Sequence, residues 1–447
     1  MGVDNLSDEL LLEIVKFLKI GGRHADLSCL ASCSRRWNRI TTPLLYRDVK
    51  QSDEHALTSL LYTMLKKPDL AELVQSYAAA EIEDVEPDVL KPLYEHLDKF
   101  RRSIESTNAA DNQTSRWLAR MQQGNWQALT TLLLLNLPNL KELTLGSYNN
   151  HSIFEAADPG SLGFVLAMAA RQQLSGETSV PSFQNLLKVA VAYADTEMGL
   201  GFEEVACFLE LPSVKDFHIH MLDGTDFESS TPGKQFHTRK LVVSYSAVEP
   251  ESLPPFLQCF PDLEYFSYEH AGGIVGCMEF LPQTLGLGIQ HLKHNLKTLK
   301  VFGSPEAGDG DEPMAVGSLK DFENLAFLHL EQATLLGFDE EEDSDSNAEA
   351  VEAVHLWKIL PSSLMTLALS SCSLKIFNEF EGLLERKGGV TPKLCDVGFQ
   401  FLEFSHEPEY GEGFIARAKT GGVDLLLESD SGPSYRIGDF SARYLWY

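Results

Sequence analysis

Two histidines, His218 and His220, come nearest to a chemical site by residue type and spacing. They alternate along the predicted strand D-F-H-I-H, so both side chains point to the same side of it. Imidazole nitrogens bind zinc, and a third ligand from a neighbouring strand would complete such a site. A second pair, His291 and His294, stands three residues apart on a possible helix without a matching carboxylate or cysteine. Neither pair makes a metal site by itself, so we predict no metal and no cofactor.

The sequence carries none of the short motifs that mark common active sites. G-x-S-x-G, G-x-x-x-x-G-K-[ST], H-E-x-x-H and a helix-opening G-x-G-x-x-G are all missing. No nucleophile can be paired with a base from the sequence. We therefore predict no catalytic residues and a protein that is not an enzyme, with an unrecognised hydrolase as the remote alternative.

Charge and cysteine content restrict the partners and the compartment. The 447 residues include 65 acidic and 36 basic ones, for a net charge of -29. This charge repels nucleic-acid phosphates and anionic lipids, so we predict neither nucleic acid nor a membrane as a partner. Seven cysteines without a C-x-x-C pair indicate reduced thiols. With neither a secretory signal pattern nor an apolar run of about 20 residues, we expect a cytoplasmic and/or nuclear protein.

A short phrase with apolar residues spaced L-x-x-L-x-L recurs along the chain. Clear copies are P-N-L-K-E-L-T-L at 138–145, H-N-L-K-T-L-K-V at 294–301 and S-S-L-M-T-L-A-L at 362–369. The middle apolar residues of the copies are Leu143, Val189, Phe217, Leu241, Phe266, Leu299, Leu328, Leu367 and Val397, with a further weak copy near Leu426. Many of the spacings lie near the about 20 to 29 residues of leucine-rich repeats. Such a strand buries its apolar face only by stacking on its neighbours.

This pattern predicts an α/β fold. We expect an irregular leucine-rich-repeat-like solenoid with parallel strands on its concave face and helices or loops on its convex face. The residues between the apolar positions of each strand would point to the concave face, where repeat proteins bind partners. Aromatic side chains there are favoured as binding hot spots. The candidate target-binding residues are His218, His220, Tyr265, Glu269, Lys300, Phe302, Phe327 and His329. The alternative, that insertions cover this face, stays open.

The first 46 residues predict a small helical module. Leu10, Ile14, Phe17 and Leu18 form the apolar stripe of an amphipathic helix with Ser7 as its N-cap. A second helix carries Leu27 and Leu30, and a third carries Trp37 until Pro43 ends it. So small a module, with apolar residues beyond a single stripe, indicates a partner surface.

Residues 6–46 resemble an F-box. The stretches L-S-D-E-L-L-L-E-I-V-K-F-L, D-L-S-C-L-A-S-C-S-R-R-W-N-R-I and T-P-L-L-Y follow the F-box order L-P-x-E-L-L-x-x-I-L-x-x-L, D-L-x-x-L-x-x-V-C-R-R-W and a final L-Y or L-W, with Ser7 in place of the usual proline. The repeat region, notably L-P-N-L-K-E-L-T-L, resembles that of fungal F-box proteins with leucine-rich repeats. The adaptor-binding residues that the resemblance implies are Leu6, Leu10, Ile14, Leu18, Leu27, Leu30, Cys33, Trp37 and Leu44.

The resemblance implies the substrate-recognition subunit of a cullin-RING (SCF-type) ubiquitin ligase. The F-box would dock a Skp-family adaptor, and through it a cullin, while the solenoid binds an unidentified target protein. One alternative is an interaction protein that binds the adaptor without ubiquitin transfer. Another is an ordinary helical cap whose apolar residues pack on the solenoid.

These readings divide the chain into an F-box at 1–50, a helical joint at 51–130 and the solenoid at 131–447. In the joint, residues 106–115 are polar and predict a mobile loop, whereas 72–79 predict an early strand. An acidic block at 339–345 predicts a solvated loop, and Ser344 within it and Ser346 next to it suit phosphorylation by acid-directed kinases.

Overall fold

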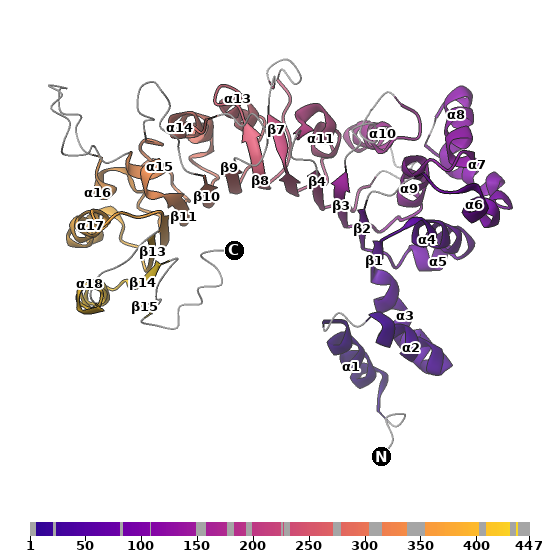
Figure 1. Ribbon diagram of the computed structural model, residues 1–447, viewed down its shortest axis with the longest axis horizontal. Helices are drawn as coiled ribbons and strands as arrows, with labels where there is room; N and C mark the ends of the chain where they lie inside the picture. Colours follow the sequence, from indigo (N-terminus) through magenta and orange to yellow (C-terminus); the bar gives the residue numbers. More distant parts are fainter. Residues whose placement is uncertain are drawn as a thin grey trace. The chain divides into compact units, whose positions relative to one another are not determined.

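Helices and short strands alternate along the chain (Figure 1). The structure, a computed structural model, describes residues 6–20, 24–80, 84–107, 109–148, 158–176, 183–193, 199–224, 227, 233–270, 279–303, 315–337, 354–401, 408–429 and 435–436. Internal contacts divide the chain into two compact units. Unit 1 comprises Met1–Ala194 and Glu204–Phe217, and unit 2 comprises Asp195–Glu203 and His218–Tyr447. Each unit has its own parallel strands and helices.

Unit 1 begins with a cluster of three helices, α1 (Asp8–Ile20), α2 (His24–Cys33) and α3 (Arg35–Arg47). Its strands are β1 (Asp48–Gln51), β2 (Ser76–Ala80), β3 (Glu142–Tyr148) and β4 (Lys188–Tyr193). The helices between them are α4 (Glu54–Lys66), α5 (Pro68–Ala71), α6 (Pro87–Tyr94), α7 (Leu97–Glu105), α8 (Asp111–Gln122), α9 (Trp126–Leu135) and α10 (Leu162–Ser175). Both α11 (Phe202–Leu209) and β6 (Asp216–His220) carry residues of the two units.

The strands of unit 1 pair in parallel and in chain order, β1 with β2, β2 with β3 and β3 with β4. Their registers align Tyr77 with Leu143 and Leu143 with Val189, and all three side chains are buried. The hydroxyl of Tyr77 donates to Gln51 Oε1 at 2.8 Å, which satisfies a polar group inside the core. The repeat pattern therefore starts at β1.

Unit 2 continues the alternation of strands and helices. Its strands are β5 (Leu200–Gly201), β7 (Leu222–Gly224), β8 (Lys240–Val248), β9 (Tyr265–His270), β10 (Thr298–Phe302), β11 (Phe327–Glu331), β12 (Thr366–Ser370), β13 (Asp396–Phe401), β14 (Asp424–Ser429) and β15 (Tyr435–Arg436). Its helices are α13 (Leu253–Gln258), α14 (Pro282–Ile289), the 3₁₀ turn η3 (Gln290–Leu292), α15 (Gln332–Leu336), α16 (Leu356–Ile359), α17 (Ile376–Val390) and α18 (Pro408–Thr420).

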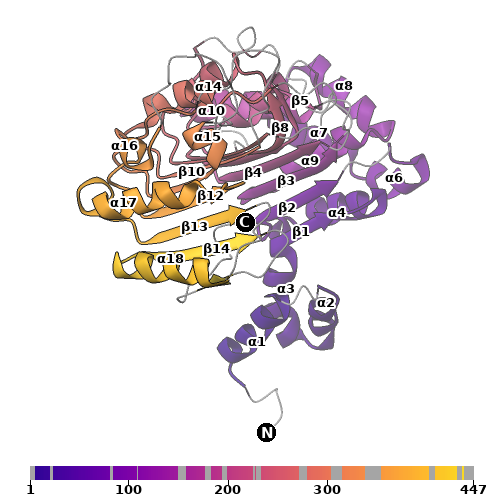
Figure 2. The same ribbon diagram turned by 60° about the vertical axis from the view of Figure 1, so that its left-hand side comes forward.

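The strands β8 to β14 of unit 2 are parallel neighbours in chain order, and β15 turns back antiparallel on β14. Figure 2 shows α18 lying along β14. The register aligns one column of fully buried residues, namely Leu241, Phe266, Leu299, Leu328, Leu367 and Val397. This confirms the predicted repeat phase and the predicted α/β fold of parallel strands with helices. At the last strand the register places Leu425 beside Val397, one residue before the predicted centre at Leu426.

Asparagines tie successive repeats together at the turn before a strand. Each stands before a buried leucine and donates its side-chain amide to a main-chain carbonyl of the preceding repeat. The bonds are Asn139 to Glu72 (2.8 Å), Asn185 to Pro138 (3.2 Å), Asn295 to Pro261 (2.9 Å) and Asn324 to His294 (2.6 Å). The N-L dipeptide of the repeated phrase is thus a structural signature, because it satisfies carbonyls that the turn leaves outside the strand ladder.

The segment at 51–130 differs from the prediction in one respect. The polar stretch 106–115 is not a loop throughout, since α8 begins at Asp111. The side chain of Gln113 accepts a hydrogen bond from the main-chain amide of Ala110 at 2.9 Å, and Asp111 lies in the first turn. The polar composition of this stretch is explained by residues that favour the start of a helix, and such residues are also common in loops. The predicted early strand at 72–79 is confirmed in part, since β2 begins at Ser76 and ends at Ala80. The divisions at residues 50 and 130 stay predictions.

Candidate functional site

The three N-terminal helices share a small apolar core. Its buried members are Leu11, Val15, Leu27, Trp37 and Ile40. The hydroxyl of Ser34 caps α3 by accepting from the main-chain amide of Trp37 at 3.2 Å. Contrary to the prediction, α3 continues past Pro43 to Arg47. The exposed Pro43 removes one helical hydrogen bond, and burial of Ile40 and Thr41 in the preceding turn of the helix offsets that loss.

An ion pair fixes α1 against α3. Asp8, in the first turn of α1, accepts from Arg36 Nε at 2.7 Å and also contacts Arg39. The hydrogen bond from Arg36 holds the pKa of the Asp8 carboxyl below its ordinary value. The pair therefore adds a side-chain link between the start of α1 and α3 to the contacts of the apolar core.

That outer face is apolar and exposed. Leu10 is 53% exposed, Ile14 41% and Phe17 77%, and these three residues stand at i, i+4 and i+7 of α1. Residues at this spacing lie along one side of a helix. The core of the cluster closes on Leu11 and Val15 without them. We call Leu10, Ile14 and Phe17 the α1 patch.

The predicted adaptor-binding residues fall into three groups. Leu10 and Ile14 lie in the α1 patch, and Cys33 is exposed with its thiol donating to the Cys29 carbonyl. Partly buried residues packed against the core are Leu6, Leu18, Leu30 and Leu44. Leu27 and Trp37 lie in the core itself, which leaves little of either side chain accessible to an adaptor, and their predicted role stays a prediction. Phe17, the most exposed apolar residue of the cluster, was missing from the predicted set although it belonged to the predicted stripe.

The second candidate surface is the strand face of unit 2 that lies opposite the buried column. Tyr265 and Phe327, in its first row, are half-buried. Lys240 Nζ lies 5.1 Å from the ring centre of Tyr265, and Lys300 Nζ lies 5.2 Å from that of Phe327. Cations at these distances are attracted by the aromatic faces. The result is a repeated lysine–aromatic pairing across neighbouring strands.

Two of the predicted target-binding residues are buried on this face. His329 is 0% exposed and Lys300 7% exposed, so the expectation of exposed side chains is wrong for both. The ring of Phe302 meets that of His329 edge to face, with the centroids 4.6 Å apart. Burial and the neighbouring Lys240 lower the pKa of Lys300, and burial raises that of Glu269. Tyr265, Phe302, Phe327 and Glu269 remain accessible in part.

His218 and His220 do point to the same side of β6, as predicted. His218 Nε2 lies 2.9 Å and His220 Nδ1 lies 3.1 Å from the hydroxyl oxygen of Ser244 on β8. The shared neighbour is a serine, and the described part of the chain holds no group of three or more histidine, cysteine or acidic residues that could bind a metal. Burial lowers the pKa of His220. The zinc alternative therefore lacks its third ligand there.

Comparison with known protein families matches residues 48–397 to the leucine-rich repeat domain. The chain belongs to the leucine-rich repeat family. Domains of this family bind other proteins. The match begins at the first residue of β1, so the three-helix cluster precedes it. A comparison with curated proteins gives no match.

Two further findings concern predicted features. Across the described residues, no helix is both long and apolar enough to cross a bilayer. Ser344 and Ser346 lie outside the described residues, as does the acidic block beside them.

Proposed function

We propose that this leucine-rich repeat protein is the substrate-recognition subunit of an SCF-type ubiquitin ligase. The three-helix cluster binds a Skp-family adaptor, and the repeats bind the target. The chain itself catalyses no step, because a separate conjugating enzyme transfers ubiquitin to the target held nearby. A cytoplasmic or nuclear location follows from this role.

The observation that carries the proposal is the α1 patch. A helical cap that only packs on its own repeats would bury its apolar side chains there, yet Leu10, Ile14 and Phe17 are exposed. Burying a large apolar side chain at an interface contributes about 1.5 to 3 kcal/mol. Three adjacent ones can therefore anchor a partner, and the F-box-like sequence of residues 6–46 favours the Skp-family adaptor as that partner.

The strand face of unit 2 supports target binding. It offers aromatic side chains at Tyr265, Phe302 and Phe327 next to the charged Lys240 and Glu269. Aromatic residues held in place by neighbours lose little entropy on binding and are common anchors of protein interfaces. The partners expected from a chain of net charge -29 are neutral or basic proteins.

Co-purification with a Skp-family adaptor tests the proposal. The intact chain should form a complex, and Leu10→Asp should abolish it, because a carboxylate would have to be buried at the contact. Lys16→Asp places the same residue about 120° away around α1 and should leave the complex intact. If the intact chain forms no complex, or if both variants bind alike, the proposal is wrong.

A reconstituted reaction separates ubiquitin transfer from adaptor binding alone. The complex with adaptor, cullin and conjugating enzyme should ubiquitylate proteins recovered with the repeats, and Leu10→Asp should stop this. An intact complex that supports no transfer would favour the alternative of an interaction protein.

A further inference from the structure

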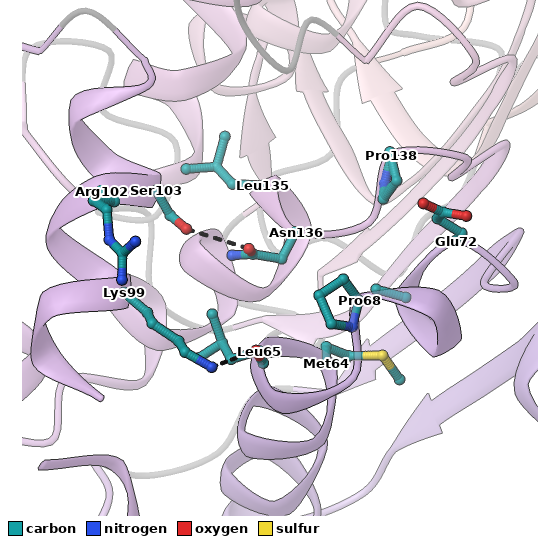
Figure 3. A pocket seen from close by; sticks show the side chains of 11 residues that line it. Met64, Leu65, Pro68, Glu72, Lys99, Arg102, Ser103, Leu135, Asn136 and Pro138 are labelled. Carbon is teal, nitrogen blue, oxygen red and sulfur yellow. Dashed lines mark hydrogen bonds between the residues drawn. The ribbon is translucent and has the colours of Figure 1, made fainter. Parts of the chain in front are cut away.

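An open cleft lies among the helices of unit 1, and its lining residues belong neither to the α1 patch nor to the strand face of unit 2. Its volume is about 450 Å³, and residues of α4, α5, α7 and the end of α9 line it (Figure 3). Pockets that hold small organic ligands measure about 300 to 1,000 Å³. The cleft is therefore large enough for a ligand of that class.

The floor of the cleft is apolar. Met64 and Leu65 at the end of α4 and Leu135 at the end of α9 line it, and each is largely buried. The exposed apolar surface of the cleft belongs to Pro68 and Pro138, which also line it. An apolar ligand body would remove this surface from water.

Polar side chains of one wall already form hydrogen bonds, two of them to main-chain carbonyls at helix ends. Lys99 Nζ donates to the main-chain carbonyl of Leu65 at 3.1 Å, and the amide of Asn136 donates to the Leu132 carbonyl at 2.8 Å. Ser103 donates to Asn136 Oδ1 at 3.2 Å. These bonds satisfy carbonyls whose negative partial charge would otherwise disfavour an anion in the cleft.

Arg102 is the group of this wall that is left for a ligand. Its Nε donates to the Asp98 carbonyl at 3.2 Å, which orients the guanidinium, and the described residues place no acidic partner on Arg102 or Lys99. The two cations stand three residues apart on α7, so both belong to the same side of the helix. Glu72 stands at the opposite end of the cleft in Figure 3.

We propose that the cleft binds a small organic anion with an apolar body. The anionic head, a carboxylate or a phosphate, accepts hydrogen bonds from the terminal nitrogens of Arg102 with Lys99 beside it. The apolar body lies on Pro68 and Pro138, next to the buried floor of Met64, Leu65 and Leu135. Arginine suits such a head because its planar fork of donors matches the oxygens of both groups. This inference does not depend on the proposed function.

Fluorescence of anilinonaphthalene sulfonate, an anion with an apolar body, tests the site in the full chain. The intact protein should bind the dye with enhanced emission, and Arg102→Glu should weaken binding roughly tenfold or more. Arg101→Glu makes the same charge change on the neighbouring residue of α7, which does not line the cleft, and should have little effect. Equal binding by the two variants would overturn the proposal. Arg102→Gln, with folding checked by circular dichroism, guards against an effect of misfolding.

Displacement of the dye identifies the chemistry of the head group. Decanoate and decyl phosphate should both compete, and the stronger of the two names the preferred head. Decanol, which has the same apolar chain and no charge, should compete at least about tenfold less well. If decanol competes as well as decanoate, the cleft is only an apolar crevice and the assignment of Arg102 is wrong.

Discussion

The three-helix cluster and the repeat strands differ in how much of their apolar surface they bury. In unit 2 the aligned column from Leu241 to Val397 is fully buried, since each strand covers its neighbour and helices pack on the same face. In α1, Leu11 and Val15 are buried while Leu10, Ile14 and Phe17 are exposed. Strands of a repeat array complete each other, whereas a module of about 45 residues has too little interior for all its apolar side chains. In the proposed function, this surplus is the surface that binds a partner.

The largest effect should come from the buried column. Phe266→Ala, at a residue 0% exposed, should destabilise the protein by about 3 to 5 kcal/mol, because it leaves a cavity in the core. Phe17→Ala, at a residue 77% exposed, should change stability by about 0.5 kcal/mol at most. Chemical denaturation of both variants measures the contrast. Similar denaturation midpoints for the two variants would contradict the difference in burial between the two regions.

An alanine substitution in the core of the three-helix cluster should cost less stability than one in the buried column of unit 2. It should cost more than one in the α1 patch. Leu27→Ala removes a side chain that is 0% exposed and should cost about 2 to 4 kcal/mol of local stability. Hydrogen exchange of the amides in α2 and α3 reports this opening. Leu10→Ala serves as the control, and an equal rise in exchange for the two variants would contradict the assignment of Leu10 to the surface.

The asparagine links between repeats should contribute a smaller amount each. Asn295→Ala removes the hydrogen bond to the Pro261 carbonyl and should cost about 1 kcal/mol. Lys320→Ala, at an exposed residue of unit 2, should cost close to nothing. Thermal or denaturant unfolding compares the two, and identical curves would show that the N-L signature has no structural role.

The smallest effect concerns pH and the ion pair of the cluster. The folded pKa of Asp8 is lower than its ordinary value of 3.8, so the pair contributes stability above that pH and loses it as the pH falls through the folded pKa. Protection of the α1 amides from exchange, corrected for the pH dependence of the intrinsic exchange rate, should therefore fall in acid more steeply for the intact chain than for Asp8→Asn. Parallel profiles for the two proteins would count against the pair.

The repeat phase could be predicted because it is local. Alternation within five residues determines which side chains point to the core, and the residues predicted from Leu143 to Val397 are all buried. The same alternation does not predict how far the side chains on the opposite face of the strands are buried. This is why the burial of Lys300 and His329 was not foreseen.

In α1 the sequence offers more apolar residues than one stripe can hold. Leu10, Leu11, Ile14, Val15 and Phe17 all fit a helical period, and which of them is buried depends on how α2 and α3 pack against α1. The cleft beside Arg102 escaped prediction for a similar reason. Its walls come from helices that lie far apart in the sequence and meet only in the fold.

The affinity for a Skp-family adaptor tests the central claim most directly. Calorimetry should show that Phe17→Ala weakens binding by roughly tenfold or more, since its large exposed ring loses its contact. Leu287→Ala, at a residue of unit 2 that is 66% exposed, removes a comparable apolar side chain and should leave the affinity unchanged. An affinity that is the same for Phe17→Ala and the intact chain would contradict the account.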